Sequence, residues 1–490
     1  MISSGLSAMT PEQVANVQKT VDQFSATQNQ TGILLLVQDH GKTHTFTAGY
    51  AKPKLKEKIQ SEHLFEIGSA SKVFTGIAIL QLIEQGKIAL DTPIKKFYPT
   101  GAITQLANIK GENYWDQVTI GMLLNHTSGF IDYLNVYEDD EKAMQILAGQ
   151  GKSYSFEQLI RLAIDHGDAN FKPGNSFKYC NTGYIILGDI ISKVSKTDWH
   201  DYIQNHILDA VGMPRTYFGS RIPQDILDSM PQGYFNGKAS SMPPSLAGSA
   251  GEIISNLNDL EKFMLAWSTG KLYSKTETLA NQLKDDMHLM SPLADNFFYG
   301  NAIMKIGDFY GHGGQTFGFQ SFIAANQVTQ QIFVVGTNDA AVNSLNLLTA
   351  VAALPIHKEQ IGKQKAFQAP APAPPLKLTD TAWQLTEVVQ KTLPSAADLR
   401  TVNITFTKDG KTKGFSGCNS FNGGYTSKAS SLKLGPLMST RRACAGAAGE
   451  LEILILQALD KVDGYSISDE SQIMNLESKG APILRFKRKP

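Results

Sequence analysis

The sequence predicts an α+β fold, in which helices and an antiparallel sheet form a large N-terminal part, followed by a small part made mainly of strands. In the large part, predicted strands lie near both ends and predicted helices lie between them, without regular alternation. The run from Gln368 to Leu376, QAPAPAPPL, favours extended polyproline geometry and separates the two parts. The chain has 490 residues, which is more than one hydrophobic core usually supports.

The large part opens with a predicted β-hairpin. Ile33 to Val37 is a compact apolar run, Asp39 to Gly41 is a turn, and a second strand continues through Phe46. Ser69 to Gln85 carries apolar residues close to helical spacing, and Gly86 stands where a helix cap would. These apolar positions are Val73, Phe74, Ile77, Leu80 and Ile83.

Three further elements complete the large part. Tyr184 to Val194 has the apolar composition of a buried helix. Phe319 to Ala325 and Gln331 to Thr337 are predicted to be adjacent strands joined by a polar turn. Helices together with adjacent antiparallel strands give the α+β class.

The last part of the chain is predicted to be a small, mainly β domain. One helix, over about Glu450 to Val462, interrupts several short strands. The strand candidates are Val402–Phe406, Lys413–Phe415, Leu432–Leu434 and Ile483–Phe486. We therefore expect domains at residues 1–362 and 378–490, joined by an Ala/Pro-rich linker at 363–377.

The composition is that of an ordinary globular protein, with 42% apolar and 18% charged residues. Lys plus Arg and Asp plus Glu balance at 45 each, so no nucleic acid or anionic membrane surface is expected as a partner. Met1 to Thr10 lacks the basic and apolar runs of a signal peptide, and no segment reaches the roughly 18 apolar residues of a membrane span. The composition leaves the compartment open.

Ser69 and Lys72 form the first candidate catalytic pair. Their i, i+3 spacing puts both side chains on one face of the predicted helix. A serine at a helix N-terminus lies beside backbone N–H groups that favour developing negative charge, and a desolvated lysine can act as a base. The spacing recurs at 268–271 and 430–433, so it is weak evidence alone. The position at the head of an apolar helix singles out Ser69.

A second motif is Tyr179-Cys180-Asn181. A phenol beside a cation can have its pKa lowered enough to move protons, and the amide can hold both a lysine and a substrate. Tyr-x-Asn recurs at 133–135 and 234–236, where a packed tyrosine is the simpler interpretation. The turn before Tyr179 and the apolar helix after it favour this copy. Cys180 fits a slot that needs only a small side chain.

A third motif is His312-Gly313-Gly314. Glycines at these positions would let a strand backbone approach a bound ligand closely. Their N–H groups could complete an oxyanion hole with the N–H group of Ser69. A histidine taken alone is more often structural, but this setting favours a functional role.

These three motifs, in this order, resemble the serine β-lactamase and penicillin-binding family, in the branch with class C β-lactamases, D-Ala-D-Ala carboxypeptidases and related esterases. The resemblance covers about residues 15–355. It implies a β-lactamase-like domain with an antiparallel sheet flanked by helices plus an all-helical lobe. Further stretches that carry it are Phe65–Thr75, Gly86–Pro93, Leu123–Phe130, Ala247–Gly251 and Ser255–Leu260.

The family's mechanism implies a role for each matching residue. Ser69 would be the acylated nucleophile, with Lys72 and Tyr179 as the proton-transfer pair. The oxyanion hole would consist of the backbone N–H groups of Ser69 and Gln315. His126 would have a structural role in its loop. The substrate-binding positions would be Asn181, which would also contact the lysine, His312, Gly313, Gly314 and Gln315.

The chain departs from class C β-lactamases where these carry Lys-Thr-Gly, because it has His312 at the first position. Histidine is a poorer permanent cation near neutral pH, which moves the expected substrate from β-lactams towards D-amino-acid peptides or esters. We expect a serine hydrolase acting through an acyl-enzyme on an amide or ester, without a cofactor, in the periplasm or outside the cell. The alternative is a penicillin-binding-type sensor or scaffold, acylated without useful turnover. His40 and His44 flank a turn and are not expected to bind metal.

The tail carries a second resemblance, to the META domain, a small β-rich module of bacterial envelope and heat-shock-related proteins. The residues that carry it are Trp383, Phe415–Asn419, Tyr425 and Ser439–Cys444. The resemblance implies a fold and a possible envelope partner, but little chemistry. Cys418 and Cys444 would pair in an exported protein or stay as buried thiols, and the sequence leaves both alternatives open.

Overall fold

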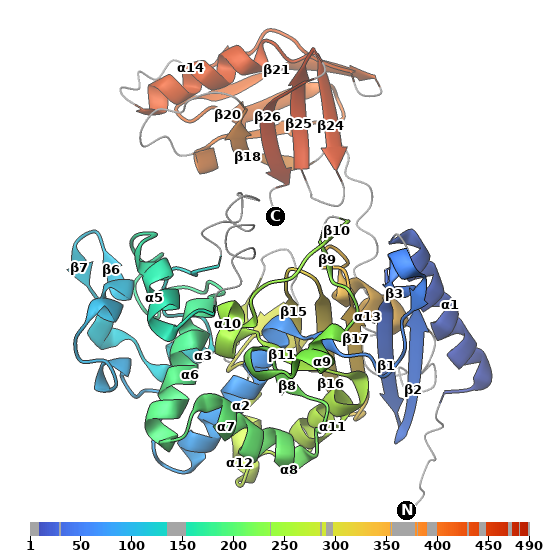
Figure 1. Ribbon diagram of the computed structural model, residues 1–490. Helices are drawn as coiled ribbons and strands as arrows, with labels where there is room; N and C mark the ends of the chain where they lie inside the picture. The colour runs from blue at the N-terminus through green and yellow to red at the C-terminus, as the bar shows by residue number, and fades with distance from the viewer. Residues whose placement is uncertain are drawn as a thin grey trace, which may run out of the picture. The chain divides into compact units, whose positions relative to one another are not determined.

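The computed structural model describes residues 9–28, 31–134, 153–235, 237–284, 287–290, 297–352, 354, 378–379, 381–389, 399–428, 431–440, 447–468, 473–479 and 481–488. The chain divides into two compact units, Met1–Phe367 and Gln368–Pro490 (Figure 1). The expected linker at 363–377 lies outside the described residues. No helix among the described residues has both the length and the apolar character needed to cross a membrane.

An eight-stranded antiparallel sheet forms the centre of the first unit. Its strands follow the order β12-β13-β14-β15-β16-β17-β1-β2, so the N-terminal hairpin pairs with the last strand of the unit. The predicted hairpin is confirmed, and its turn has positive φ at His40 and Gly41, as a tight hairpin turn requires. The predicted strands at 319–325 and 331–337 are confirmed as β16 and β17. The strands are β1 (Ile33–Asp39), β2 (Lys42–Ala48), β12 (His288–Leu289), β13 (Phe297–Tyr299), β14 (Met304–Ile306), β15 (Phe309–Gln315), β16 (Gln320–Asn326) and β17 (Ile332–Thr337).

Helices cover both faces of this sheet. On one face α1 (Pro11–Thr27) and α13 (Ser344–Ala352) share a hydrophobic core with alternate sheet residues, among them Leu35. On the other face α11 (Leu257–Ser268) contacts β1, β16 and β17. Every residue of β1 is buried for this reason, which explains why its sequence is a continuous apolar run rather than an alternating one.

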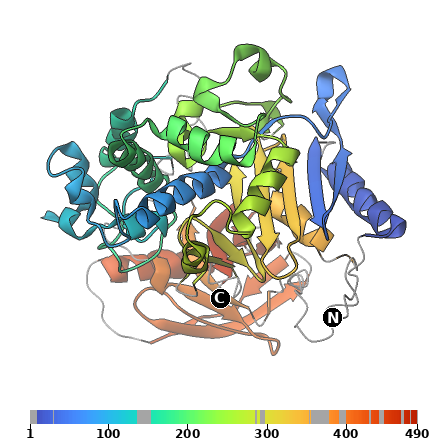
Figure 2. The ribbon, with the colours of Figure 1, turned by 90° about the horizontal axis from the view of Figure 1, so that it is seen from below.

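A helical lobe completes the first unit, and α2 (Ser71–Glu84) runs between this lobe and the sheet (Figure 2). The predicted helix is confirmed, and 12 of its 14 residues are buried, so α2 is enclosed on all sides, including at positions outside its apolar spacing. The predicted helix at 184–194 is confirmed as α6 (Asn181–Ser195), which packs against α2 and begins with Asn181 itself. Other helices of the lobe are α3 (Ile120–Leu124), α5 (Phe156–Ile164) and α7 (Trp199–Ile203).

The described residues of the second unit are mainly strands with one α-helix, as predicted, and the sheet closes into a barrel, which the sequence did not predict. Its nine-stranded sheet closes because β20 pairs with both β19 and β21. Helix α14 (Ala447–Leu459) contributes apolar side chains to the core that also holds Trp383. Cys418 is disulfide-bonded, and its partner lies outside the described residues. The strands are β18 (Ala382–Val388), β19 (Asn403–Phe406), β20 (Lys411–Phe415), β21 (Ser420–Lys428), β22 (Ser431–Leu434), β23 (Met438–Ser439), β24 (Gly464–Ser468), β25 (Ile473–Ser478) and β26 (Ala481–Arg488).

Candidate active site

Ser69 lies in a tight turn between the short strand β5 (Phe65–Glu66) and α2. The turn is a single 3₁₀ turn, Gly68–Ala70, and Gly68 has a φ of +51°. A Cβ atom on Gly68 would lie 2.7 Å from the backbone nitrogen of Gln315, so only glycine permits this approach of the two chains. Ser69 is half-buried, whereas its two neighbours in the chain, Gly68 and Ala70, are buried.

Lys72 is completely buried, one helical turn after Ser69. Its Nζ atom lies 3.1 Å from Ser69 Oγ and donates to Asn181 Oδ1 at 2.7 Å and to the Ala250 carbonyl at 2.9 Å. A neutral amine has two hydrogens, and both are engaged in this way, so its lone pair is left for Ser69. Burial lowers the pKa of Lys72 to about 7, against the opposing effect of the Asp132 carboxylate. Lys72 can therefore accept a proton from Ser69 near neutral pH.

Asn181 is hydrogen-bonded to Asp132, a residue that no sequence motif indicated. Asp132 Oδ2 accepts hydrogen bonds from the backbone N–H group of Asn181 at 2.9 Å and from its side-chain Nδ2 at 2.8 Å. Asp132 Oδ1 accepts from the Leu134 N–H group at 2.9 Å. Burial raises the pKa of Asp132, and these hydrogen bonds act in the opposite direction. A single aspartate without a recurring spacing gives no sequence signal for this role.

Tyr179 lies over Lys72, with its ring centroid 4.9 Å from Nζ. Burial raises the pKa of Tyr179 well above its usual value, and the nearby Ser69 hydroxyl only partly offsets this effect. The expectation that the neighbouring lysine lowers the pKa of Tyr179 is therefore wrong. The Tyr179 hydroxyl is buried without a hydrogen bond to any described residue. Tyr179 is thus a protonated phenol, suited to donate a proton rather than to act as the resting base.

His126 holds the segment that carries Tyr179. Its carbonyl oxygen accepts from the Lys178 N–H group at 3.0 Å, and its Nδ1 atom accepts from the Cys180 N–H group at 3.1 Å. The ring centroids of His126 and Tyr179 are 4.2 Å apart. Burial lowers the pKa of His126 well below its usual value, so the ring is neutral. These contacts agree with the structural role that the resemblance implies.

Strand β15 places its glycine-rich backbone against the nucleophile turn. A Cβ atom on Gly314 would lie 1.8 Å from the Ile67 carbonyl oxygen, and Ser321 Oγ donates to the same oxygen at 2.7 Å. The backbone of Gln315 therefore lies beside Gly68, next to the nucleophile. An oxyanion hole formed by two backbone N–H groups needs this placement.

The side chain of His312 is directed into the core and is completely buried. Its Nδ1 atom donates to the Gly313 carbonyl at 2.6 Å, and its Nε2 atom accepts from the Tyr299 hydroxyl at 2.9 Å. Burial, with the charge of Lys72, lowers the pKa of His312 to about 3. Because both ring nitrogens are engaged inside the protein, the structure does not support the direct substrate contact predicted for this side chain.

The stretch Ala247–Gly251 also lies against α2. Besides the Ala250 carbonyl on Lys72, the Ser249 carbonyl accepts from Thr75 Oγ1 at 2.7 Å. The Ala250 carbonyl thus holds the buried lysine, while the Ser249 carbonyl ties the same stretch to α2. In the part of the chain that the structure describes, no group of three or more His, Cys, Asp or Glu side chains is arranged to hold a metal ion.

This fold, with a serine, a buried lysine, a tyrosine and an asparagine brought together in one site, defines a protein of the serine β-lactamase and penicillin-binding class. A family model described as Beta-lactamase matches residues 17–355, more than half of the sequence, and the chain belongs to this family. A second model, described as META domain, matches residues 376–490.

Individual relatives are distant. Penicillin-binding protein 4* of Bacillus subtilis is 30% identical over 193 residues, which cover 39% of this chain and 38% of that protein. The match thus spans less than half of the curated relative's length. The crystal structure of a D-stereospecific amidohydrolase from Streptomyces sp. has 25% identity and a TM-score of 0.60, covering 69% of this chain and 98% of that chain. An octameric penicillin-binding protein homologue from Pyrococcus abyssi, at 21% identity and a TM-score of 0.61, shares the fold over 97% of this chain and 100% of its own.

Proposed function

We propose that this protein is a serine hydrolase that cleaves an amide or ester bond through an acyl-enzyme on Ser69. The observation that carries the proposal is the environment of Lys72, which is completely buried, has a pKa lowered to about 7 and faces Ser69 Oγ at 3.1 Å. The three hydrogen-bond partners of Nζ are Asn181 Oδ1, the Ala250 carbonyl and Ser69 Oγ. Of these three, only the Ser69 hydroxyl can give a proton to the neutral amine.

Acylation uses the groups of the site in order. Lys72 takes the proton of the Ser69 hydroxyl as Oγ forms a bond to the substrate carbonyl carbon. The N–H groups of Ser69 and Gln315 stabilise the negative charge on the carbonyl oxygen. Tyr179 donates its proton to the leaving nitrogen or oxygen as that bond breaks, and the Lys72 ammonium returns a proton to Tyr179. The enzyme is left as an ester with both side chains in their starting forms.

Deacylation repeats the same transfers with water. Lys72 accepts a proton from a water molecule as the water oxygen attacks the acyl carbon, and the proton reaches Ser69 Oγ as the ester bond breaks. The product is a carboxylic acid. If water cannot reach the acyl carbon, the protein stays acylated and acts as a sensor or scaffold.

Strand β15, as described, offers the substrate no fixed cation, which supports an amide or ester substrate without a carboxylate beside the reacting bond. Strand β15 carries no lysine or arginine, and His312 is buried with a pKa lowered to about 3. The likeness to a D-stereospecific amidohydrolase supports D-amino-acid amides or peptides as the first substrates to test.

A substrate panel tests the proposal. We expect turnover of p-nitrophenyl esters and D-amino-acid amides, weak turnover of nitrocefin, and complete loss in Ser69→Ala. Intact-mass spectra after mixing with a β-lactam distinguish the alternative, because a sensor would stay acylated for hours. No labelling of Ser69 by a fluorophosphonate probe would overturn the proposal.

We further propose an oxidising compartment, the periplasm or the exterior, and an envelope partner for the META domain. The disulfide at Cys418 supports the compartment, since such bonds persist mainly outside the cytosol. Cell fractionation, with the protein tracked by antibody, tests this assignment, and recovery in the cytosol alone would contradict it.

A further inference from the structure

We infer that Asp132 is a positioning residue that fixes the Asn181 amide with its oxygen towards Lys72, and so keeps the base aimed at Ser69. The inference rests on the proposed hydrolase function. Asp132 is only 4% exposed, so it offers no surface to a substrate. Its two oxygens are used entirely inside the protein, on three N–H donors.

The shape of an amide leaves two orientations open to the Asn181 side chain. The oxygen and nitrogen ends of Asn181 have nearly the same shape, and a half-turn of the side chain would exchange them. The turned amide would place an NH₂ group 2.7 Å from Lys72 Nζ, where the oxygen now lies, so that two donors would face each other. Asp132 prevents this turn, because an ionised carboxylate accepts hydrogen bonds and cannot donate them.

Asp132 is itself held firmly in place. The next residue, Tyr133, donates its N–H group to Thr182 Oγ1 at 3.1 Å and its hydroxyl to the Leu246 carbonyl at 2.5 Å. The Asp132 carboxylate accepts the N–H group of the first residue of α6, where the helix dipole favours negative charge. The carboxylate therefore has a fixed position from which to orient Asn181.

Asp132 also acts on Lys72 through its charge. Other titratable groups around Lys72 are neutral near pH 7, because burial raises the pKa values of the tyrosines and the thiol and lowers those of the histidines. These groups are Tyr179, Tyr184, Cys180, His126 and His312. Asp132 is the group that raises the pKa of Lys72 most, although burial outweighs it. Removing its charge should therefore lower the pKa of Lys72 further.

The test compares Asp132→Asn with Asp259→Asn as a matched control. Asp259 is also buried, at 2% exposed, and accepts from the Arg215 N–H group at 2.7 Å and from Thr216 Oγ1 at 3.1 Å, outside the site. For Asp132→Asn, kcat/KM on a p-nitrophenyl ester should fall roughly 10- to 100-fold, because the base is misplaced. The acid limb of its pH profile should move to lower pH. In Asp259→Asn, the acid limb of the pH profile of kcat/KM should stay at the wild-type pH.

Asp132→Glu separates position from charge, because it retains the carboxylate but displaces it. This variant should lose a similar factor in kcat/KM while its acid limb stays at the wild-type pH. Circular dichroism establishes that each variant is folded, and Asp132→Glu decides the question if Asp132→Asn does not fold. Wild-type rates in Asp132→Glu, or an unmoved limb in folded Asp132→Asn, would overturn the inference.

A titration that needs no activity separates this inference from the proposed function. The pKa of Lys72, followed by NMR on lysine-labelled protein, should be lower in Asp132→Asn than in the wild type. If the wild-type protein hydrolyses nothing but this shift is seen, the proposed function fails and the positioning role stands. If turnover is seen without the shift, only the positioning role fails.

Discussion

The Oγ atom of Ser69 and the Nζ atom of Lys72 lie 3.1 Å apart across the boundary between solvent and core. Ser69 is half-buried, whereas Lys72 is completely buried. A nucleophile must meet its substrate, but a lysine becomes a base near neutral pH only when it is desolvated. The tight turn that ends in the buried helix α2 meets both requirements within four residues of chain.

The pH dependence of hydrolysis should follow Lys72. Burial lowers its pKa to about 7, so the neutral amine predominates above that pH and the charged, inactive form below it. We expect kcat/KM to rise with pH through a midpoint near 7. Neither His126 nor His312 can supply this limb, because burial lowers both of their pKa values. Lys72→Arg, which stays charged, should lose at least about 100-fold throughout. A rate that is constant down to pH 5 would contradict the assignment.

Tyr179→Phe should remove catalysis without destabilising the fold. The hydroxyl makes no hydrogen bond to the described residues, so its loss costs none, while the proton donor to the leaving group disappears. We expect kcat/KM to fall by roughly 100- to 10,000-fold, with little change in thermal midpoint. Tyr184→Phe is the matched control, because that hydroxyl donates to the Leu124 carbonyl at 2.7 Å. Compared with Tyr179→Phe, Tyr184→Phe should lower the thermal midpoint more and kcat/KM less. A larger loss of kcat/KM in Tyr184→Phe than in Tyr179→Phe would refute the assignment of Tyr179 as the proton donor.

The fold was largely predictable because its elements carry local patterns. The hairpin turn at His40 and Gly41 and the apolar run of β1 specify their own structure. The enclosure of α2 was not predictable, because apolar spacing indicates one face and cannot show that polar residues such as Lys72 and Gln81 are also buried. That depends on tertiary neighbours.

In the candidate site, too, some features could be predicted from the sequence and others could not. Ser69, Tyr179 and Asn181 stand in motifs whose spacing is visible, and the structure brings them together around Lys72. The Ala250 carbonyl has no sequence signal, because every residue has a carbonyl group. The direction of the pKa shift of Tyr179 depends on how deeply its hydroxyl is buried, which a neighbouring charge in the sequence does not reveal.

Gly314→Ala should move strand β15 away from the turn that carries Ser69. The new Cβ atom would lie 1.8 Å from the Ile67 carbonyl oxygen, so β15 must move away from Gly68. We expect a loss of roughly 100-fold or more in kcat, because the N–H group of Gln315 leaves the position that the oxyanion needs. Gly183→Ala is the control, since its Cβ atom would meet nothing closer than 3.5 Å. Equal losses in the two variants would argue against an oxyanion hole at this position.

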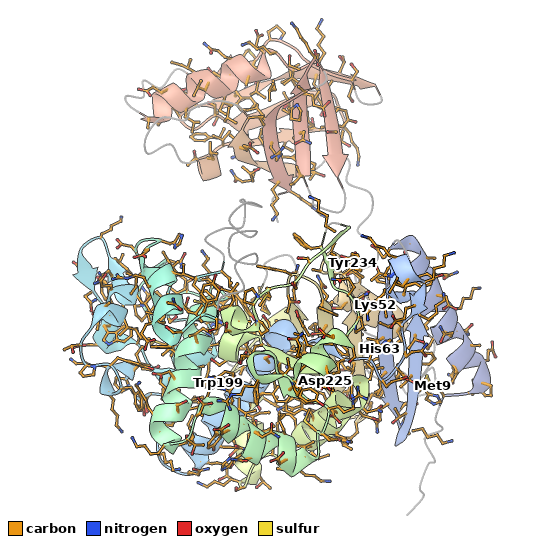
Figure 3. The ribbon with its side chains drawn as sticks, viewed as in Figure 1. Met9, Lys52, His63, Trp199, Asp225 and Tyr234 are labelled. Carbon is orange, nitrogen blue, oxygen red and sulfur yellow. The ribbon has the colours of Figure 1, made fainter. Side chains whose placement is uncertain are left out.

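A hydrogen-bonded network around the buried Glu252 side chain anchors the chain that follows Ala250. His200 follows Trp199 in the sequence, and Trp199 is labelled in Figure 3. His200 contacts Glu252 Oε1 at 2.8 Å and Asp198 Oδ1 at 2.7 Å. The Glu252 side chain is only 1% exposed. His200→Ala should therefore lower the free energy of unfolding by about 3 kcal/mol, measured in urea, because it leaves the buried Glu252 Oε1 atom without its hydrogen-bond partner. Arg221→Ala, at the exposed end of the network, should cost less than about 1 kcal/mol. Equal costs would show that burial of Glu252 is unimportant.

The three cysteines should give a stepwise thiol titration. Cys180 is a buried free thiol, and burial raises its pKa to about 12, so almost no thiolate is present at pH 8. Cys418 is disulfide-bonded. Native protein purified without reductant should therefore react with no thiol reagent, denatured protein should show one thiol, and denatured, reduced protein should show three. Cys180→Ala should show no thiol when it is denatured without reductant and two thiols when it is denatured and reduced. Three thiols before reduction would contradict the disulfide and would remove the chemical support for an oxidising compartment.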